Sequence, residues 1–302
     1  MRALAWVLIT FTKLVFDAHY FDGYDPAAPL NAQILSEEER EGYRRVYFAF
    51  EGVGGMRVPS LMALPLEGAG PFPTLVFLHG IGQEKEFLDQ VAGHYAAEGL
   101  VLATFDQYMQ GERRLRGANW RRKARAMYAR GALTVNEARR LVDYLETRPD
   151  VAKDRIYLIG ASYGAMTGAI AGAFDKRFKA VNLVYGGGDF TKMARSREVP
   201  KNLRRMAGPV ARLIAWFAAV SDPVRYVHAI APRPLLCQNG EKDRIVVPGA
   251  AQALYDAARE PKEIVWYPSD HLDLDPEYIP IAIKDGIAWF KAQDAKLAGT
   301  VQ

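Results

Sequence analysis

Short apolar runs alternate with longer amphipathic segments along most of the 302-residue chain. Two alternating runs, at 43–50 and 56–65, are separated by the glycines of EGVGG and predict an antiparallel pair of strands. Six further apolar runs predict more strands, at 74–80, 100–106, 154–160, 178–184, 233–240 and 262–268. Helical periodicity follows most of these six, and strands that alternate with helices indicate a mostly parallel sheet covered on both faces. The chain is therefore predicted to be an α/β protein with an eight-stranded sheet.

The same pattern predicts how the chain is divided. We expect one domain over residues 43–295, preceded by a helix and an extension in residues 1–42, where 26–36 is read as a loop. Residues 189–231, between the sixth and seventh strands, are longer than a simple connection needs. Helical periodicity from Asn202 to Val220 indicates a small helical cap over the sheet. Its apolar residues either face a ligand or pack the cap onto the body.

Composition and charge narrow the class of protein. Half of the residues are hydrophobic and a quarter are charged, which is ordinary for a globular chain. The net charge is +4, but eight basic residues lie within 112–130, and the rest of the chain carries about −4 without them. A mildly acidic body with one basic segment is a poor match to a nucleic-acid binder. The basic segment is either a solvated helix face or a site for an anionic substrate, a membrane surface or a partner.

Cysteine usage excludes two kinds of structural support. Cys237 is the only cysteine, so neither an intramolecular disulfide nor a thiolate zinc site is available. No metal or cofactor is implied by the sequence.

The N-terminal segment looks at first like an export signal, because Arg2 precedes the apolar run 3–9. Lys13 interrupts that run, however, and residues 16–18 (FDA) are a weak cleavage site. The segment is also shorter than the roughly 20 apolar residues of a transmembrane span. We favour a retained helix and a cytoplasmic protein, with export or membrane association through this segment as the alternative.

A serine lies between small residues directly after the fifth predicted strand. In LIGASYGAM, an apolar strand leads into Ser162 and a helical segment leads out of it. Gly160 and Gly164 allow strand and helix to approach closely, as they do where a nucleophilic serine stands on a sharp strand-to-helix turn. The alternative is a tight turn whose serine only caps the helix.

A serine nucleophile needs a base, and the base needs an orienting acid. His271 follows the last predicted strand in a turn-forming sequence, and it is the best placed of the five histidines. Asp243 follows the seventh strand in NGEKDRIVVP and is the favoured acid, with Asp189 and Glu241 as rivals. These residues would meet at the carboxyl edge of the sheet, where such folds bind their ligands.

The order Ser162, Asp243, His271, together with GASYGA, LHGIG and NGEKDRIVVP, resembles the α/β-hydrolase superfamily. Within it, roughly residues 43–295 are similar to the dienelactone-hydrolase-like and prolyl-oligopeptidase-like esterases. The chain departs from true dienelactone hydrolases in having serine where they use cysteine. Residues 1–42 also hold no propeller of the kind found in prolyl peptidases.

Attack on an acyl carbon places negative charge on its oxygen, which hydrogen-bond donors must stabilise. One predicted donor is the amide of Tyr163, at the start of the helix after the nucleophile. By resemblance, the second comes from the loop after His79 and Gly80, and we favour the amide of Ile81 over that of Gly82.

These residues predict a serine carboxylic-ester hydrolase that acts through an acyl-enzyme on small to medium acyl esters. The expected partner is a small-molecule ester; nucleic acid is not expected, membrane contact is not favoured, and monomer and homodimer both stay open. The alternatives are a serine peptidase or thioesterase of the same fold, or a non-catalytic binding protein.

Overall fold

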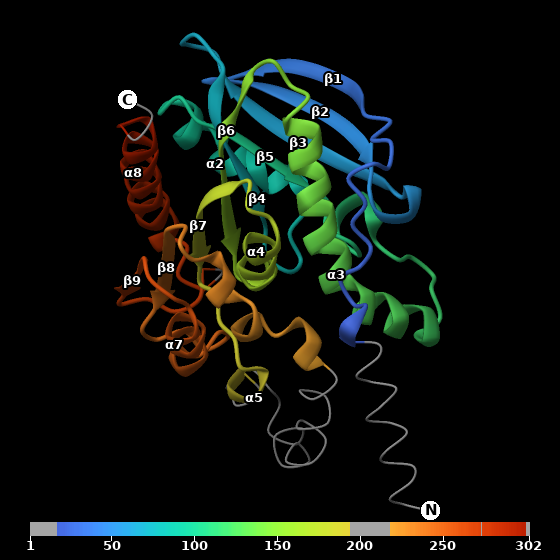
Figure 1. The fold of residues 1–302 in the computed structure, drawn as a ribbon, viewed down its shortest axis with the longest axis vertical. Helices are drawn as coiled ribbons and strands as arrows, with labels where there is room; N and C mark the ends of the chain where they lie inside the picture. The colour runs from blue at the N-terminus through green and yellow to red at the C-terminus, as the bar shows by residue number, and fades with distance from the viewer. Residues whose placement is uncertain (1–16, 194–217, 273, 300–302) are drawn as a thin grey trace, which may run out of the picture.

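The computed structural model describes residues 17–193, 218–272 and 274–299 (Figure 1). One nine-stranded sheet runs through it in the order β1-β2-β3-β5-β4-β6-β7-β8-β9. The strands are β1 (Gln33–Arg40), β2 (Tyr43–Glu51), β3 (Arg57–Pro65), β4 (Phe72–Leu78), β5 (Val101–Phe105), β6 (Val151–Ala161), β7 (Phe178–Val184), β8 (Leu235–Gly240) and β9 (Lys262–Tyr267). Strands β1, β2, β3 and β5 pair antiparallel, and all pairs from β5 through β4 to β9 are parallel. The predicted mostly parallel α/β architecture is confirmed.

The sheet has one strand more than the eight predicted. The additional strand, β1, includes part of the segment that was expected to be a loop and has the polar sequence QILSEEER. All of its residues are exposed, so no apolar alternation marks it. It exists because its backbone pairs antiparallel with β2, with an irregularity between Ile34 and Ser36.

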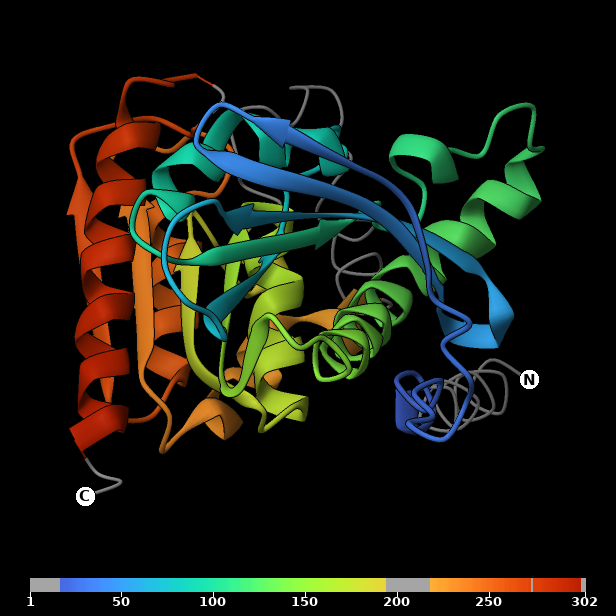
Figure 2. The same cartoon turned by 90° about the horizontal axis from the view of Figure 1, so that it is seen from above.

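Helices cover both faces of the sheet (Figure 2). One face carries α3 (Trp120–Leu145), α4 (Tyr163–Phe174) and α7 (Pro248–Ala257), and the other carries α2 (Leu88–Ala96) and α8 (Tyr278–Gly299). Apolar side chains of alternate strand residues point to opposite faces and form two separate cores, one under each helix layer. The pocket described below lies in the layer of α2 and α8.

Residues 17–32 pack against the helices of the first face. The Phe21 ring lies 5.1 Å from that of Phe174, between ring centroids. The buried guanidinium of Arg140 in α3 donates to the carbonyl oxygens of Asp25, Ala28 and Pro29. The extension is therefore tied to the domain and not a free tail in this part.

Two expectations fall on residues that the structure does not describe. The predicted N-terminal helix lies largely within 1–16, and most of the predicted cap lies within 194–217. Of residues 189–231, the described ends contain the short helix α5 (Phe190–Met193) and 3-10 turns at 219–221, 223–225 and 227–230. Within the described ranges, no helix is both long and apolar enough to cross a membrane.

Candidate active site

Ser162 is held at the junction of β6 and α4 in a strained backbone conformation. Its φ is 55° and its ψ is −116°, in a region that costs a residue with a Cβ atom about 1–3 kcal/mol. A Cβ atom on Gly164 would lie 1.8 Å from the carbonyl oxygen of Leu78, and one on Gly160 would lie 2.2 Å from that of Gly164. The small residues of the motif are therefore required by the contact between β4, β6 and the first turn of α4.

The structure brings together the three residues that the sequence singled out, although they come from three different loops. Ser162 Oγ lies 3.0 Å from His271 Nε2, and His271 Nδ1 donates to Asp243 Oδ2 at 2.7 Å. The second oxygen of Asp243 accepts the amides of Ile245 and Val246, both at 2.8 Å. Asp243 and His271 are 3% and 1% exposed. This arrangement can remove the serine proton and stabilise the imidazolium that results.

The rival Asp189 and the neighbouring Asp270 have other hydrogen-bond partners than the His271 ring. The Asp189 carboxylate accepts a hydrogen bond from the Thr191 hydroxyl at 2.5 Å. Asp270, next to the histidine in sequence, accepts the amides of Arg244 and His271. Burial raises the pKa of Asp270, but these hydrogen bonds and the Arg244 guanidinium outweigh it and lower that pKa. Among the described residues, only Asp243 hydrogen-bonds the His271 ring through a carboxylate.

His79 supports the loop beside the serine and does not reach it by hydrogen bond. Its Nδ1 and Nε2 lie 3.1 and 3.2 Å from the carbonyl oxygens of Gly80 and Phe105. Its own carbonyl oxygen accepts a hydrogen bond from Gln107 Nε2 at 2.7 Å. Burial lowers the pKa of the imidazole, so the ring is neutral near pH 7. Its hydrogen bonds hold the loop in place.

Two glutamines that the sequence analysis did not single out hold the loop that carries Ile81. The Gly80 amide donates to Gln83 Oε1 at 2.9 Å, and the Gly82 amide donates to Gln110 Oε1 at 2.6 Å. The Ile81 amide lies between them, and neither it nor the Tyr163 amide donates to another group in the described part of the chain. The Gly82 amide thus already has an acceptor, and the Ile81 amide remains the predicted second oxyanion donor.

A signal for these glutamines is present but weak. Gln83 comes three residues after Gly80, and Gln110 ends the sequence DQYMQ that follows β5. Nothing in the spacing shows that Gln110 reaches a loop 28 residues earlier, because that contact depends on how the β5 loop folds.

The basic segment 112–130 is not one solvated face. Arg113 forms two hydrogen bonds with the buried carboxylate of Glu137, at 2.6 and 2.7 Å, while residues 121–125 are exposed. Arg130 is buried, and its Cζ lies 4.4 Å from the centroid of the Tyr163 ring. Burial lowers the Arg130 pKa, and no carboxylate pairs with it among the described residues. The two ends of the segment therefore pack into the protein, and Arg130 does so beside the first residue of α4.

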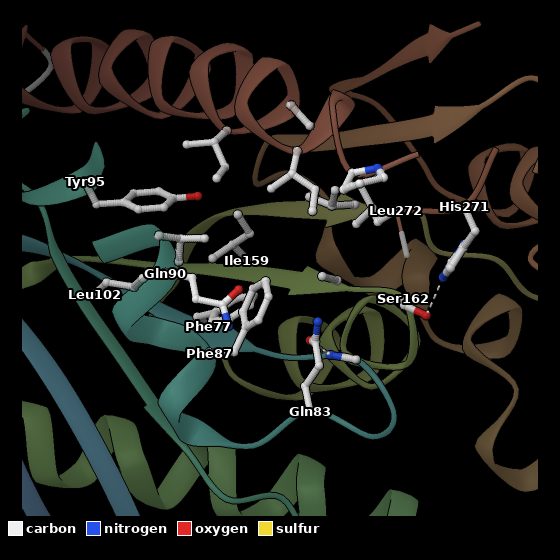
Figure 3. A pocket seen from close by; sticks show the side chains of 18 residues that line it. Phe77, Gln83, Phe87, Gln90, Tyr95, Leu102, Ile159, Ser162, His271 and Leu272 are labelled. Carbon is white, nitrogen blue, oxygen red and sulfur yellow. Dashed lines mark hydrogen bonds between the residues drawn. The ribbon is translucent and has the colours of Figure 1, made fainter. Parts of the chain in front are cut away.

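An apolar pocket of about 300 Å³ opens at Ser162 (Figure 3). It lies between the sheet and helices α2 and α8, in the body of the domain. Its walls come from all of these elements: Phe77, Gly80, Gln83, Phe87, Gln90, Val91, Tyr95, Leu102, Ile159, Ala161, Ser162, Val184, His271, Leu272, Pro276, Ile279, Ala282 and Ile283. Apolar residues of the predicted cap were one candidate for a surface that faces a ligand; the described residues that line this pocket belong to the body of the domain.

Comparisons with solved structures agree with the fold. Acetyl xylan esterase from Paenibacillus sp. R4 is 20% identical with a TM-score of 0.71, over 89% of this chain and 94% of that chain. Acetyl xylan esterase 1 from Thermoanaerobacterium sp. is 18% identical with a TM-score of 0.68, over 86% and 88%. At these identities the likeness shows the α/β-hydrolase fold.

Sequence comparisons give the family. Dipeptidyl-peptidase 5 of Porphyromonas gingivalis is 29% identical over 172 residues, which are 53% of this chain and 24% of that protein. The chain thus matches about a quarter of that relative's length. The model of the prolyl oligopeptidase family matches residues 91–295, well over half of the chain. The chain therefore belongs to the prolyl oligopeptidase family and is a hydrolase with the α/β-hydrolase fold.

Proposed function

We propose that this protein is a serine carboxylic-ester hydrolase. The observation that carries the proposal is the hydrogen-bonded series Ser162, His271, Asp243 at the mouth of an apolar pocket. A hydroxyl beside a buried, oriented imidazole is the arrangement that acyl transfer needs. The pocket supplies an apolar surface for the acyl group.

The proposed reaction has two halves. Ser162 Oγ attacks the acyl carbon as its proton passes to His271 Nε2, and the amides of Ile81 and Tyr163 hold the negative oxygen. The bond to the alcohol then breaks, and His271 returns the proton to the leaving oxygen. Water attacks the acyl-enzyme with His271 as base, which releases the carboxylic acid and restores the Ser162 hydroxyl.

Family membership favours one second candidate, a serine peptidase. A peptidase that removes short peptides must bind the terminal ammonium group of its substrate, for which an acidic side chain is the usual partner. Within the described part of the chain, no acidic side chain lines the pocket at Ser162. This favours an uncharged acyl group, and therefore an ester, over a peptide terminus.

Hydrolysis of p-nitrophenyl acetate and p-nitrophenyl hexanoate, compared with alanyl p-nitroanilide, tests the assignment. We expect both esters to be turned over with a kcat/KM well above that of the anilide. Faster turnover of the anilide would reject the esterase in favour of the peptidase. A fluorophosphonate probe should label the wild-type protein at Ser162 and leave Ser162→Ala unlabelled. A folded wild-type protein that takes no label would reject serine catalysis altogether.

A further inference from the structure

The pocket is deep as well as apolar. Ser162 and His271 lie at one end of it, and Tyr95 lies at the other (Figure 3). Leu102 lies at the same end of the pocket as Tyr95 (Figure 3), and it pairs across the sheet with Leu75, which pairs with Tyr157, five residues before Ser162. At about 3.3 Å per residue, the pocket extends about 16 Å along the strands from the serine. An acetyl group would fill only its mouth.

The walls of the pocket suit an uncharged chain. Phe77 and Ile159 of the sheet face Val91 of α2 and Ile283 of α8, and no Lys, Arg, Asp or Glu side chain from the described residues lines the space. A volume of 300 Å³ is roughly that of ten water molecules. An extended chain advances about 1.2 Å per bond, and the Tyr95 side chain fills the far end, so an acyl group of about eight chain atoms fits.

One polar group interrupts this surface at its far end. Tyr95 is only 2% exposed, and its hydroxyl points into the pocket (Figure 3). That hydroxyl makes no hydrogen bond to any other residue that the structure describes. Burial raises its pKa, so it stays protonated and can donate. A wholly apolar chain that filled the pocket would leave the hydroxyl without a partner, which is unfavourable for a buried donor.

The other polar side chains of the pocket differ from Tyr95 in this respect. Gln83 already accepts the Gly80 amide. Gln90, near the start of α2, is exposed to solvent, so its side chain can still hydrogen-bond to water when an apolar chain fills the pocket. Tyr95 is thus the group whose hydrogen bonding depends on what occupies the pocket.

We propose that the pocket selects an acyl group of about eight chain atoms with an uncharged oxygen, a carbonyl or hydroxyl, near its far end, and that Tyr95 recognises this oxygen. The inference rests on the proposed ester hydrolysis at Ser162. It makes Tyr95 a specificity-determining residue, far from the reacting atoms. A substrate that lacks the distal oxygen should bind and react more slowly because the hydroxyl is left unpaired.

The test compares p-nitrophenyl octanoate with p-nitrophenyl 7-oxooctanoate, which have equal chain lengths and acyl carbons of nearly equal reactivity. In the wild-type protein we expect kcat/KM to be about tenfold higher for the 7-oxo ester. In Tyr95→Phe the ratio of the two kcat/KM values should fall to near one, chiefly because kcat/KM for the octanoate rises. An equal ratio in the two proteins, or a wild-type preference for the octanoate, would overturn the proposal.

A second pair of variants tests the depth of the pocket. Ile283→Trp should block it and lower kcat/KM for both eight-carbon esters at least tenfold, while p-nitrophenyl acetate is still hydrolysed. Ile281→Trp, at an exposed position on the same helix, is the control and should leave kcat/KM for all three substrates unchanged. Undiminished octanoate turnover in Ile283→Trp would show that the acyl chain lies elsewhere. If the esterase assignment itself is wrong, the wild-type protein will not cleave p-nitrophenyl acetate, and this result separates that failure from failure of the present proposal.

Discussion

Gly164 lies against the carbonyl group of Leu78, so closely that a Cβ atom at this position would be 1.8 Å from the oxygen. The contact joins the first turn of α4 to the end of β4, and it brings the Ser162 corner beside the loop that carries Ile81. Because the obstructing atom is backbone, no side-chain rotation can relieve the overlap. This one glycine contact therefore helps to position Ser162 relative to the loop that carries Ile81.

Gly164→Ala should destabilise the protein by several kcal/mol or prevent it from folding, because β4 or α4 must shift. Gly168→Ala is the matched control, since its nearest neighbours are the Leu158 and Leu183 side chains at an ordinary 3.6 Å. The control should be unchanged or more stable by up to about 1 kcal/mol, because alanine favours helix. Urea denaturation gives both free energies of unfolding. Equal stability of the two variants would contradict the steric argument.

Replacing Ser162 separates catalysis from backbone strain. Ser162→Ala and Ser162→Gly should both lose at least about 10⁴-fold in ester hydrolysis, since neither has a nucleophile. The glycine variant should be more stable than the alanine variant by about 1 kcal/mol, because glycine adopts a φ of 55° without strain. Calorimetry should show this as a Tm higher by about 2–4 °C. A lower Tm for the glycine variant would mean that the strain is small compared with the added flexibility of the unfolded chain.

Gln110 should act on turnover through the oxyanion loop. Gln110→Leu leaves the Gly82 amide without its acceptor, so the loop can move and the Ile81 amide loses its position. We expect kcat for p-nitrophenyl acetate to fall about tenfold with KM changed less than twofold, as measured by steady-state kinetics. Gln252→Leu, an exposed glutamine on α7 that bonds Asp256, should leave kcat unchanged. A rise in KM alone for Gln110→Leu would place this residue in substrate binding and not in loop positioning.

A carboxylate of α8 should make stability depend on pH. Asp294 accepts hydrogen bonds from Arg155 at 2.7 Å and from Tyr157 at 2.5 Å, which join α8 to β6. Burial raises the Asp294 pKa, but these hydrogen bonds and the Arg155 charge outweigh it, and the pKa lies below its usual 3.8. A lowered pKa in the folded state gives stability that is present above pH 3.8 and lost as the pH falls through the folded value.

Asp294→Asn should therefore lower the free energy of unfolding at pH 7 by about 1 kcal/mol, and the difference from wild type should shrink below pH 3.8. Asp256→Asn, at an exposed position on α7, serves as the control. Its free energy of unfolding should differ less from that of the wild type, both at pH 7 and below pH 3.8. The measurement is urea denaturation at several pH values. A difference for Asp294→Asn that does not change with pH would show that the carboxylate's charge is not what stabilises α8.

Strands with contiguous apolar residues could be predicted from the sequence, and β1 could not. The run 154–160 lies within β6, and the run 178–184 is β7 itself, since burial on both faces requires mostly apolar residues. The polar residues of β1 are compatible equally with a loop. Only the free edge of β2 makes that segment a strand, by backbone pairing that side chains do not encode.

The sequence by itself determined the order of most strands and helices and the place of the candidate site residues among them, because burial requires apolar runs and a sharp corner requires small residues. It left Asp189 as an alternative to Asp243, and Gly82 as an alternative to Ile81. Only the tertiary structure shows that Asp243 hydrogen-bonds His271 and that the Gly82 amide already has an acceptor, since these contacts depend on how separate loops meet at the sheet edge. It also decided where the apolar pocket lies, because a space between α2, α8 and the sheet arises from helix packing over residues far apart in the chain.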